Sequence, residues 1–188
     1  MKAPTREDVK KLDRLICYLR ATRDKPSRLG CTLPMTVTVS IDATFANREQ
    51  MKSTSGMCVT LGVGNFISSS KVQKLNSKSS TESEIIAVTD GMNIPLWLAG
   101  FIAYQGHGKR PVRLEQDNQS CIALLNKGRS TAEITRFIEV RQFWISDYIR
   151  IGAVNIVYVP TEDMTSDYYT KPLQGTVFSK MVKKILGN

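Results

Sequence analysis

The sequence has very few of the residues on which several common mechanisms depend. His107 is the only histidine among 188 residues, so catalysis by a nucleophile paired with histidine has little support. The four cysteines lie far apart and form no CxxC pair, which argues against a zinc site or a disulfide framework. Three of them lie in apolar patterns, and buried free thiols are the prediction. An enzyme built from this chain would depend on carboxylates.

Long hydrophobic runs are also missing. The most apolar stretch, Ile94–Tyr104, is shorter than the roughly 20 residues that cross a bilayer. The N-terminal residues MKAPTREDVKK lack the apolar core of a signal peptide. GVGN at 62–65 lies between two predicted strands, so it indicates a hairpin and not a phosphate-binding loop. We therefore expect an intracellular protein without a membrane anchor.

Positive charge is what the chain has in excess. It carries 26 Lys and Arg against 17 Asp and Glu, a formal net charge of +9. An excess of this kind favours polyanionic partners, of which nucleic acid is the usual one, although many basic surfaces are only solvated. The hydrophobic content of 41% is ordinary for a globular protein with a buried core.

Two regions are distinguished by their patterns. Residues 1–34 are predicted to form a helix over Thr5–Ala21, with Thr5 as N-cap, and a linker that contains proline and glycine. Residues 35–188 are predicted to form the main domain. The first strand of that domain is expected at Met35–Ile41, where apolar and polar residues alternate.

The remaining periodicity of the main domain predicts its architecture. Three hairpin-linked strands are followed by a long helix that Pro95 interrupts, and then by strands at 112–116 and 154–159 that alternate with helices. Hairpin-linked strands are antiparallel, whereas strands joined through a helix are parallel. We therefore predict an α/β fold with a five-stranded mixed sheet, three antiparallel strands and then two parallel ones, flanked by helices.

Four acids stand out by their positions in this arrangement. Asp42 follows the first strand, Glu84 lies in the first turn of the long helix, Asp117 follows the fourth strand, and Asp167 begins the helix after the fifth. Each has an ordinary structural explanation as strand terminator, capping partner, Asx turn or N-cap. Ligands of open sheets, however, bind beyond the carboxyl ends of strands. Crowded carboxylates stay ionised only with cations among them, so the four together favour a divalent-metal site.

The chemistry of such a site follows from its ligands. Hard oxygen ligands suit Mg²⁺, with Mn²⁺ as a substitute. Two ions about 3.5–4 Å apart can clamp the attacking and leaving oxygens of a phosphodiester. Hydrolysis by this route needs neither a side-chain nucleophile nor histidine. A lysine or arginine in place of the cations would instead indicate a passive scaffold.

Five segments resemble the ribonuclease H domain of copia-type LTR retrotransposons. In chain order they are IDATFA, KSTSG, SSTESEIIA, QDNQSCIAL and YVPTEDMTSDYYTKPL, spread over about Val37–Leu173. The resemblance implies an RNase H-like fold, dependence on two magnesium ions, and cleavage of the RNA strand of RNA–DNA hybrids. DRLICYLRATRD is similar to the end of the connection segment of such polyproteins. The polymerase portion of a reverse transcriptase, or another protein assembly, is then an expected partner, in a cytoplasmic particle or the nucleus.

The resemblance also implies site residues. The family's acids fall on Asp42, Glu84, Asp117 and Asp167, the same four that position selects. Glu84 matches better than Glu82 because an acid followed directly by apolar residues and alanine is the family's pattern. Asp42 would contact both ions, Glu84 and Asp117 the first, and Asp167 the second. The candidate substrate-binding residues are Thr44, Asn118 and Gln119, with a plain capping role as the alternative for Asn118.

Some positions depart from the family's pattern, and alternatives stay open. Thr44 and Phe45 replace a second acid and a tryptophan, Ser69 or a neighbour replaces another tryptophan, and Phe137 stands where histidine is usual. These departures allow a domesticated, catalytically weak or inactive module that binds nucleic acid or a protein. A strand-transferase core is disfavoured, because it needs three acids at a different spacing and lacks the TKPL helix.

Overall fold

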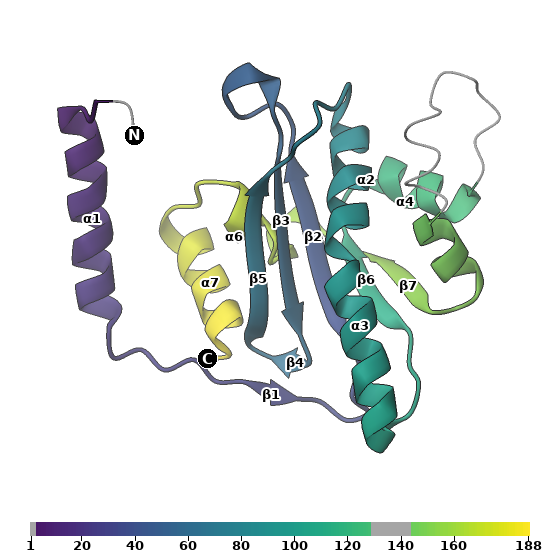
Figure 1. Cartoon of the computed structure of the whole chain (residues 1–188). Coiled ribbons are helices and arrows are strands. Elements are labelled where there is room, and N and C mark those ends of the chain that lie inside the picture. Colours follow the sequence, from purple (N-terminus) through teal and green to yellow (C-terminus); the bar gives the residue numbers. More distant parts are fainter. Residues whose placement is uncertain (1–2, 129–143) are drawn as a thin grey trace.

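The computed structural model describes residues 3–128 and 144–188, and Figure 1 shows a central sheet with helices on both sides. The five strands lie in the order β5-β3-β2-β6-β7. They are β2 (Thr38–Thr44), β3 (Thr54–Thr60), β5 (Asn65–Val72), β6 (Val112–Gln116) and β7 (Val154–Tyr158). Adjacent strands among β2, β3 and β5 are antiparallel, whereas β6 runs parallel to β2 and β7 parallel to β6. The predicted five-stranded mixed sheet is confirmed.

The helices form two layers. The first layer consists of α2 (Ser80–Gly91), α3 (Asn93–Ile102), α4 (Gln119–Lys127) and the helical residues 144–150. The opposite layer consists of α6 (Asp167–Thr170) and α7 (Gly175–Leu186). In the predicted long helix over Ile134–Ile149, the residues before Trp144, with Phe137, lie outside the described part of the chain.

Strand β2 sends alternate side chains to these two layers. Val39 and Ile41 are fully buried in the main core with α2, whereas Ser40 faces α6, with its Oγ 2.9 Å from Ser166 Oγ. Asp42 shares the face of Ser40. The strand begins and ends three residues later than predicted, because its pairing with β3 continues as far as Thr44. Asp42 therefore lies inside the strand and not at its end.

The long helix is broken where α2 meets α3. Pro95 lies in the first turn of α3, a position at which the missing backbone N–H is tolerated. Taken as one run, Ser80–His107 is long and apolar enough to cross a membrane by length and composition alone. Its most buried residues, among them Ile85, Val88 and Met92, belong instead to the core over the sheet. This is the composition of a core helix.

The N-terminal helix α1 (Arg6–Thr22) stands beside the sheet domain in Figure 1. Thr5 caps it as predicted, and its Oγ1 accepts a hydrogen bond from the backbone N–H of Asp8. None of its residues is buried, and its apolar face stays about half exposed. The linker after it is partly ordered, because β1 (Gly30–Cys31) pairs with β4 (Gly62–Val63). The division at residue 34 stays a prediction.

Two cysteines are buried, not three. All four thiols are free, but only Cys58 and Cys121 lie in the core. Cys17 is exposed because the apolar face of α1 is not covered, and Cys31 is exposed in the short strand β1.

Gly56 of β3 allows α6 to lie directly on the sheet. A Cβ at this position would lie 2.5 Å from Thr170 Cγ2 and 2.9 Å from the carbonyl oxygen of Ser166. We expect Gly56→Ala to lower the free energy of unfolding by ~2–3 kcal/mol, since helix and strand must separate. Urea unfolding measures this. Gly100→Ala in α3 is the control, because its Cβ meets nothing within 4 Å; equal stability of the two variants would contradict the close contact.

Candidate metal site

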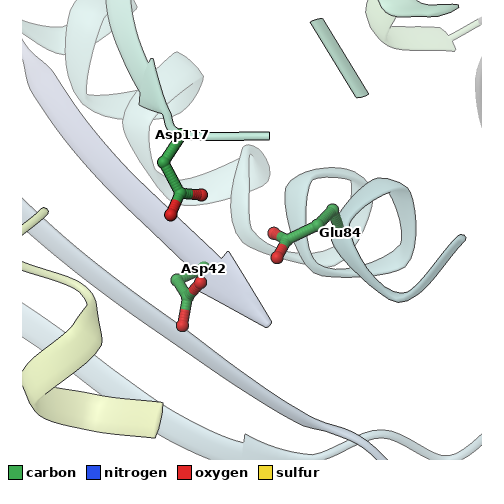
Figure 2. A group of neighbouring side chains, drawn as sticks. All are labelled: Asp42, Glu84 and Asp117. Carbon is green, nitrogen blue, oxygen red and sulfur yellow. The ribbon is translucent and has the colours of Figure 1, made fainter. Parts of the chain in front are cut away.

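Three of the four predicted acids converge at one end of the sheet. Asp42 comes from β2, Glu84 from α2, and Asp117 directly follows β6 (Figure 2). One carboxylate oxygen of each lies within 4.8 Å of the others. Asp42 and Glu84 are buried, and Asp117 is half-buried. The parallel pairing of β2 with β6 places Asp42 and Asp117 at the same end of the sheet, and Glu84 near the start of α2 approaches them there.

Glu84 and Glu82 have separate roles. Ser79 is the N-cap of α2 and accepts a hydrogen bond from the Glu82 backbone N–H at 3.1 Å. The Glu82 carboxylate in turn accepts from the Lys78 backbone N–H at 2.6 Å. The interpretation of Glu84 as a capping partner is wrong, because Ser79 is the N-cap and Glu82 is the acid three residues after it. Glu84 instead lies among the other acids.

Gln116 connects two of the acids, a role that was not predicted from the sequence. This fully buried side chain accepts hydrogen bonds from the backbone N–H groups of Asp117 and Asn118, at 2.8 and 2.9 Å. Its Nε2 donates to Glu84 Oε2 at 3.3 Å and to the Ile41 carbonyl at 3.4 Å. Gln116 therefore positions Glu84 and the turn that carries Asp117. The sequence did contain a signal for it: Gln116 follows Val112 and Leu114 at alternate positions of β6, so its side chain should point inward as theirs do.

Burial and mutual repulsion make these acids difficult to ionise. Burial raises the pKa of Glu84 to about 9, and the negative charge of Asp42 adds to the effect. Burial likewise raises the pKa of Asp42, although the hydroxyl of Thr170 donates a hydrogen bond to its carboxylate and opposes the shift. The three carboxylates can lie this close together only if some of them are protonated or if they share a bound cation. Three hard oxygen donors at this separation fit a divalent ion such as magnesium.

We call Asp42, Glu84 and Asp117 the trio. Within the described chain, Asp167 is not part of it, and a lysine lies beside Asp167. Lys171 Nζ is 2.8 Å from Asp167 Oδ1 and 3.6 Å from Asp42 Oδ1. Burial raises the pKa of Asp167 to about 6 against the opposing hydrogen bond from Lys171. Burial alone would lower the pKa of Lys171, but the hydrogen bond to Asp167 and the nearby acids raise it, so the ammonium stays charged. Ser166 is the N-cap of α6, and Asp167 is the first residue of the helix. The interpretation of Asp167 as the N-cap is therefore wrong.

The three predicted substrate-binding residues lie within two positions of Asp42 or Asp117 in the chain, and their role stays a prediction. Thr44 Oγ1 donates to the Thr170 carbonyl at 3.3 Å. Asn118 Oδ1 accepts from the Cys121 backbone N–H at 2.9 Å, which is the capping role, while Gln119 is exposed in the first turn of α4. Thr161 was not predicted; its Oγ1 donates to Asp117 Oδ2 at 2.7 Å.

The topology and the acids together define an RNase H-like fold, as the sequence motifs predicted. The chain is similar to RNase H1 of Halobacterium salinarum, with a TM-score of 0.47 and 15% identity over 70% of this chain and 90% of that one. The foamy viral protease–reverse transcriptase in complex with an RNA/DNA hybrid is also similar, with a TM-score of 0.46 and 14% identity over 93% of this chain and 21% of that one. No protein-family model matches.

The homologues are Pol polyproteins of copia/Ty1-type retrotransposons, so the predicted resemblance is confirmed. The chain is 29% identical to the Pol polyprotein of transposon RE1 from Arabidopsis thaliana, over 98% of this chain and 13% of that protein. It is 25% identical to that of transposon TNT 1-94 from Nicotiana tabacum, over 100% of this chain and 14% of the relative. The Gag-Pol polyprotein of transposon Ty1-JR2 from Saccharomyces cerevisiae is 26% identical, over 90% of this chain and 10% of that protein. The chain thus spans about an eighth of the length of its curated relatives.

Proposed function

We propose that this chain is a magnesium-dependent ribonuclease H, an endonuclease that hydrolyses the RNA strand of RNA–DNA hybrids. The observation that carries the proposal is the convergence of Asp42, Glu84 and Asp117 on an RNase H-like sheet. These acids would hold the first magnesium ion, with Asp42 and Asp167 toward a second; Mn²⁺ could substitute. When bound, the metal supplies stabilisation of negative charge on phosphate oxygens.

The chain's own residues would prepare the site for this chemistry. Gln116 orients Glu84, and Thr161 orients Asp117 through its 2.7 Å hydrogen bond. Asn118 and Gln119 lie at the N-terminus of α4, where backbone N–H groups favour a phosphate. Contacts to phosphates and 2′-hydroxyls select the hybrid without reading bases, so cleavage should not depend on sequence. The net charge of +9 supports binding of such a polyanion.

The polymerase portion of a reverse transcriptase is the protein partner we propose. The support is that the relatives are much longer Pol polyproteins and that the apolar face of α1 stays about half exposed, although Tyr18 contacts Phe178 of α7. A cytoplasmic particle or the nucleus would be the location of such an assembly.

Cleavage of a labelled hybrid tests the proposal. With Mg²⁺, the parent should cut the RNA strand of the hybrid, and double-stranded DNA should stay intact. Asp117→Asn should reduce the rate by ~100-fold, since one ligand of the trio is lost. Asp147→Asn is the matched control, because this acid is exposed and pairs with Arg150. No magnesium-dependent cleavage by the parent would refute the nuclease.

A second candidate is a nucleic-acid-binding module without nuclease activity. The ammonium of Lys171 beside Asp42 and Asp167 favours it, because a protein cation already balances part of the acid cluster. This candidate predicts tight binding of the hybrid without cleavage by the parent or by Asp117→Asn.

A further inference from the structure

We infer that Lys171 is a resident counter-ion, which holds the position between Asp42 and Asp167 and must move away before a second divalent cation can bind there. The inference rests on the proposed function for the identity of that cation. The acid cluster then has two cation sites. The trio forms the first, and at the second, between Asp42 and Asp167, the ammonium of Lys171 competes with a divalent cation.

The geometry of the ion pairs supports this division. Lys171 Nζ lies 2.8 Å from Asp167 Oδ1 and 3.6 Å from Asp42 Oδ1, so one ammonium serves both acids. The exposed fractions of the two acid side chains are 7% and 3%. No other ion pair in residues 3–128 and 144–188 has a carboxylate as buried as these. A buried carboxylate without a counter-charge is costly, so the lysine stabilises both acids when no metal is bound.

The local structure holds the backbone of Lys171 in place. Its N–H donates to the Asp167 carbonyl at 2.9 Å, which closes the single turn of α6, and Pro172 follows. Ser70 Oγ donates to the Tyr169 carbonyl at 2.6 Å and ties the helix to β5. With the backbone fixed and the side chain 34% exposed, the ammonium can leave by rotation of its side chain alone.

This arrangement produces competition between two cations. A dication near Asp42 and Asp167 would repel the ammonium, so it binds only the fraction of molecules in which the lysine points away. The apparent affinity of the second site falls by that fraction. Lys171 therefore weakens the second ion relative to the first, and the trio fills first as the metal concentration rises.

Calorimetric titration of Mn²⁺ into the metal-free protein tests the inference without measuring cleavage. The parent should bind one ion, and a second one more weakly. Lys171→Gln should strengthen the second binding step by about tenfold, as expected when one partly buried charge beside the ligand is removed, and leave the first nearly unchanged. Lys171→Arg should keep the parent's pattern, because the cation is retained. Lys180→Gln is the matched control, since this lysine pairs with the exposed Asp163 at 2.7 Å.

Thermal unfolding in EDTA adds a second measurement. Lys171→Gln should unfold at a lower temperature than the parent, because two buried acids lose their counter-ion, and added Mn²⁺ should more than reverse the difference. Identical second-step affinities for the parent and Lys171→Gln would overturn the inference, even if the parent binds Mn²⁺ and cleaves hybrids. A parent that binds no Mn²⁺ would overturn the proposed function instead.

Discussion

Asp42→Asn should abolish hybrid cleavage and still leave a protein that is at least as stable as the parent without metal. Asp42 lies between the trio and the Asp167–Lys171 pair, so its carboxylate is shared by both halves of the site. An amide cannot neutralise a cation there, and the loss of several kcal/mol of charge stabilisation corresponds to at least ~10³-fold in rate.

The stability half of this expectation follows from burial. Burial raises the pKa of Asp42, which means that folding disfavours its ionised form. Asparagine can accept the same hydrogen bond from Thr170 without carrying charge. We therefore expect no decrease in melting temperature in EDTA. Asp90→Asn, at an exposed position of α2, controls for loss of one negative charge. A variant that loses activity because it unfolds would contradict the argument.

Glu84→Gln should stabilise the metal-free protein, and the gain should grow with pH. Burial raises the pKa of Glu84 in the folded protein to about 9, from its ordinary value of 4.5. Between these values the unfolded chain releases a proton that the folded chain keeps, so the parent loses stability as the pH rises. Glutamine cannot titrate. The variant should exceed the parent by ~4–5 kcal/mol at pH 8 and by ~1 kcal/mol or less at pH 5.

Urea unfolding in EDTA at the two pH values measures this difference. Glu49→Gln is the control, because this acid is exposed in the short 3-10 helix Glu49–Met51 between β2 and β3. Magnesium should reverse the order at pH 8, since it stabilises only the protein that retains the full trio. A gain of equal size at pH 5 and pH 8 would show that Glu84 is not held protonated by the fold.

Much of the fold could be predicted because its signals are local. Alternation along Val37–Ile41, the hairpin at 62–65 and the cap at Asn118 all depend on neighbours in the chain, and each occurs as expected within a few residues. The ends of β2 could not be predicted in this way, since they depend on pairing with β3. The capping partner of α2 was wrongly assigned to Glu84 because Ser79, Ser80 and Thr81 are all suitable N-caps by residue type.

The site could be predicted in part for the same reason. Three acids were found because strand ends and helix starts mark the same edge of a sheet. The roles of Gln116 and Lys171 were missed, because Gln116 bonds Glu84 across 32 positions and Lys171 reaches Asp42 from another layer of the molecule. Position and motif select the acids, but neither indicates which groups compensate their charge.

The origin of the trio in three separate segments also affects assembly of the protein. Asp117 reaches Asp42 only after β6 has docked beside β2, a parallel pairing that spans more than seventy positions of the chain. A dication therefore finds its full set of ligands only after β6 has paired with β2. Once bound, it ties remote segments together, and at a hundred times its dissociation constant such a ligand adds about 2.7 kcal/mol to the free energy of unfolding. Bound magnesium would then stabilise the fold after its strands have assembled.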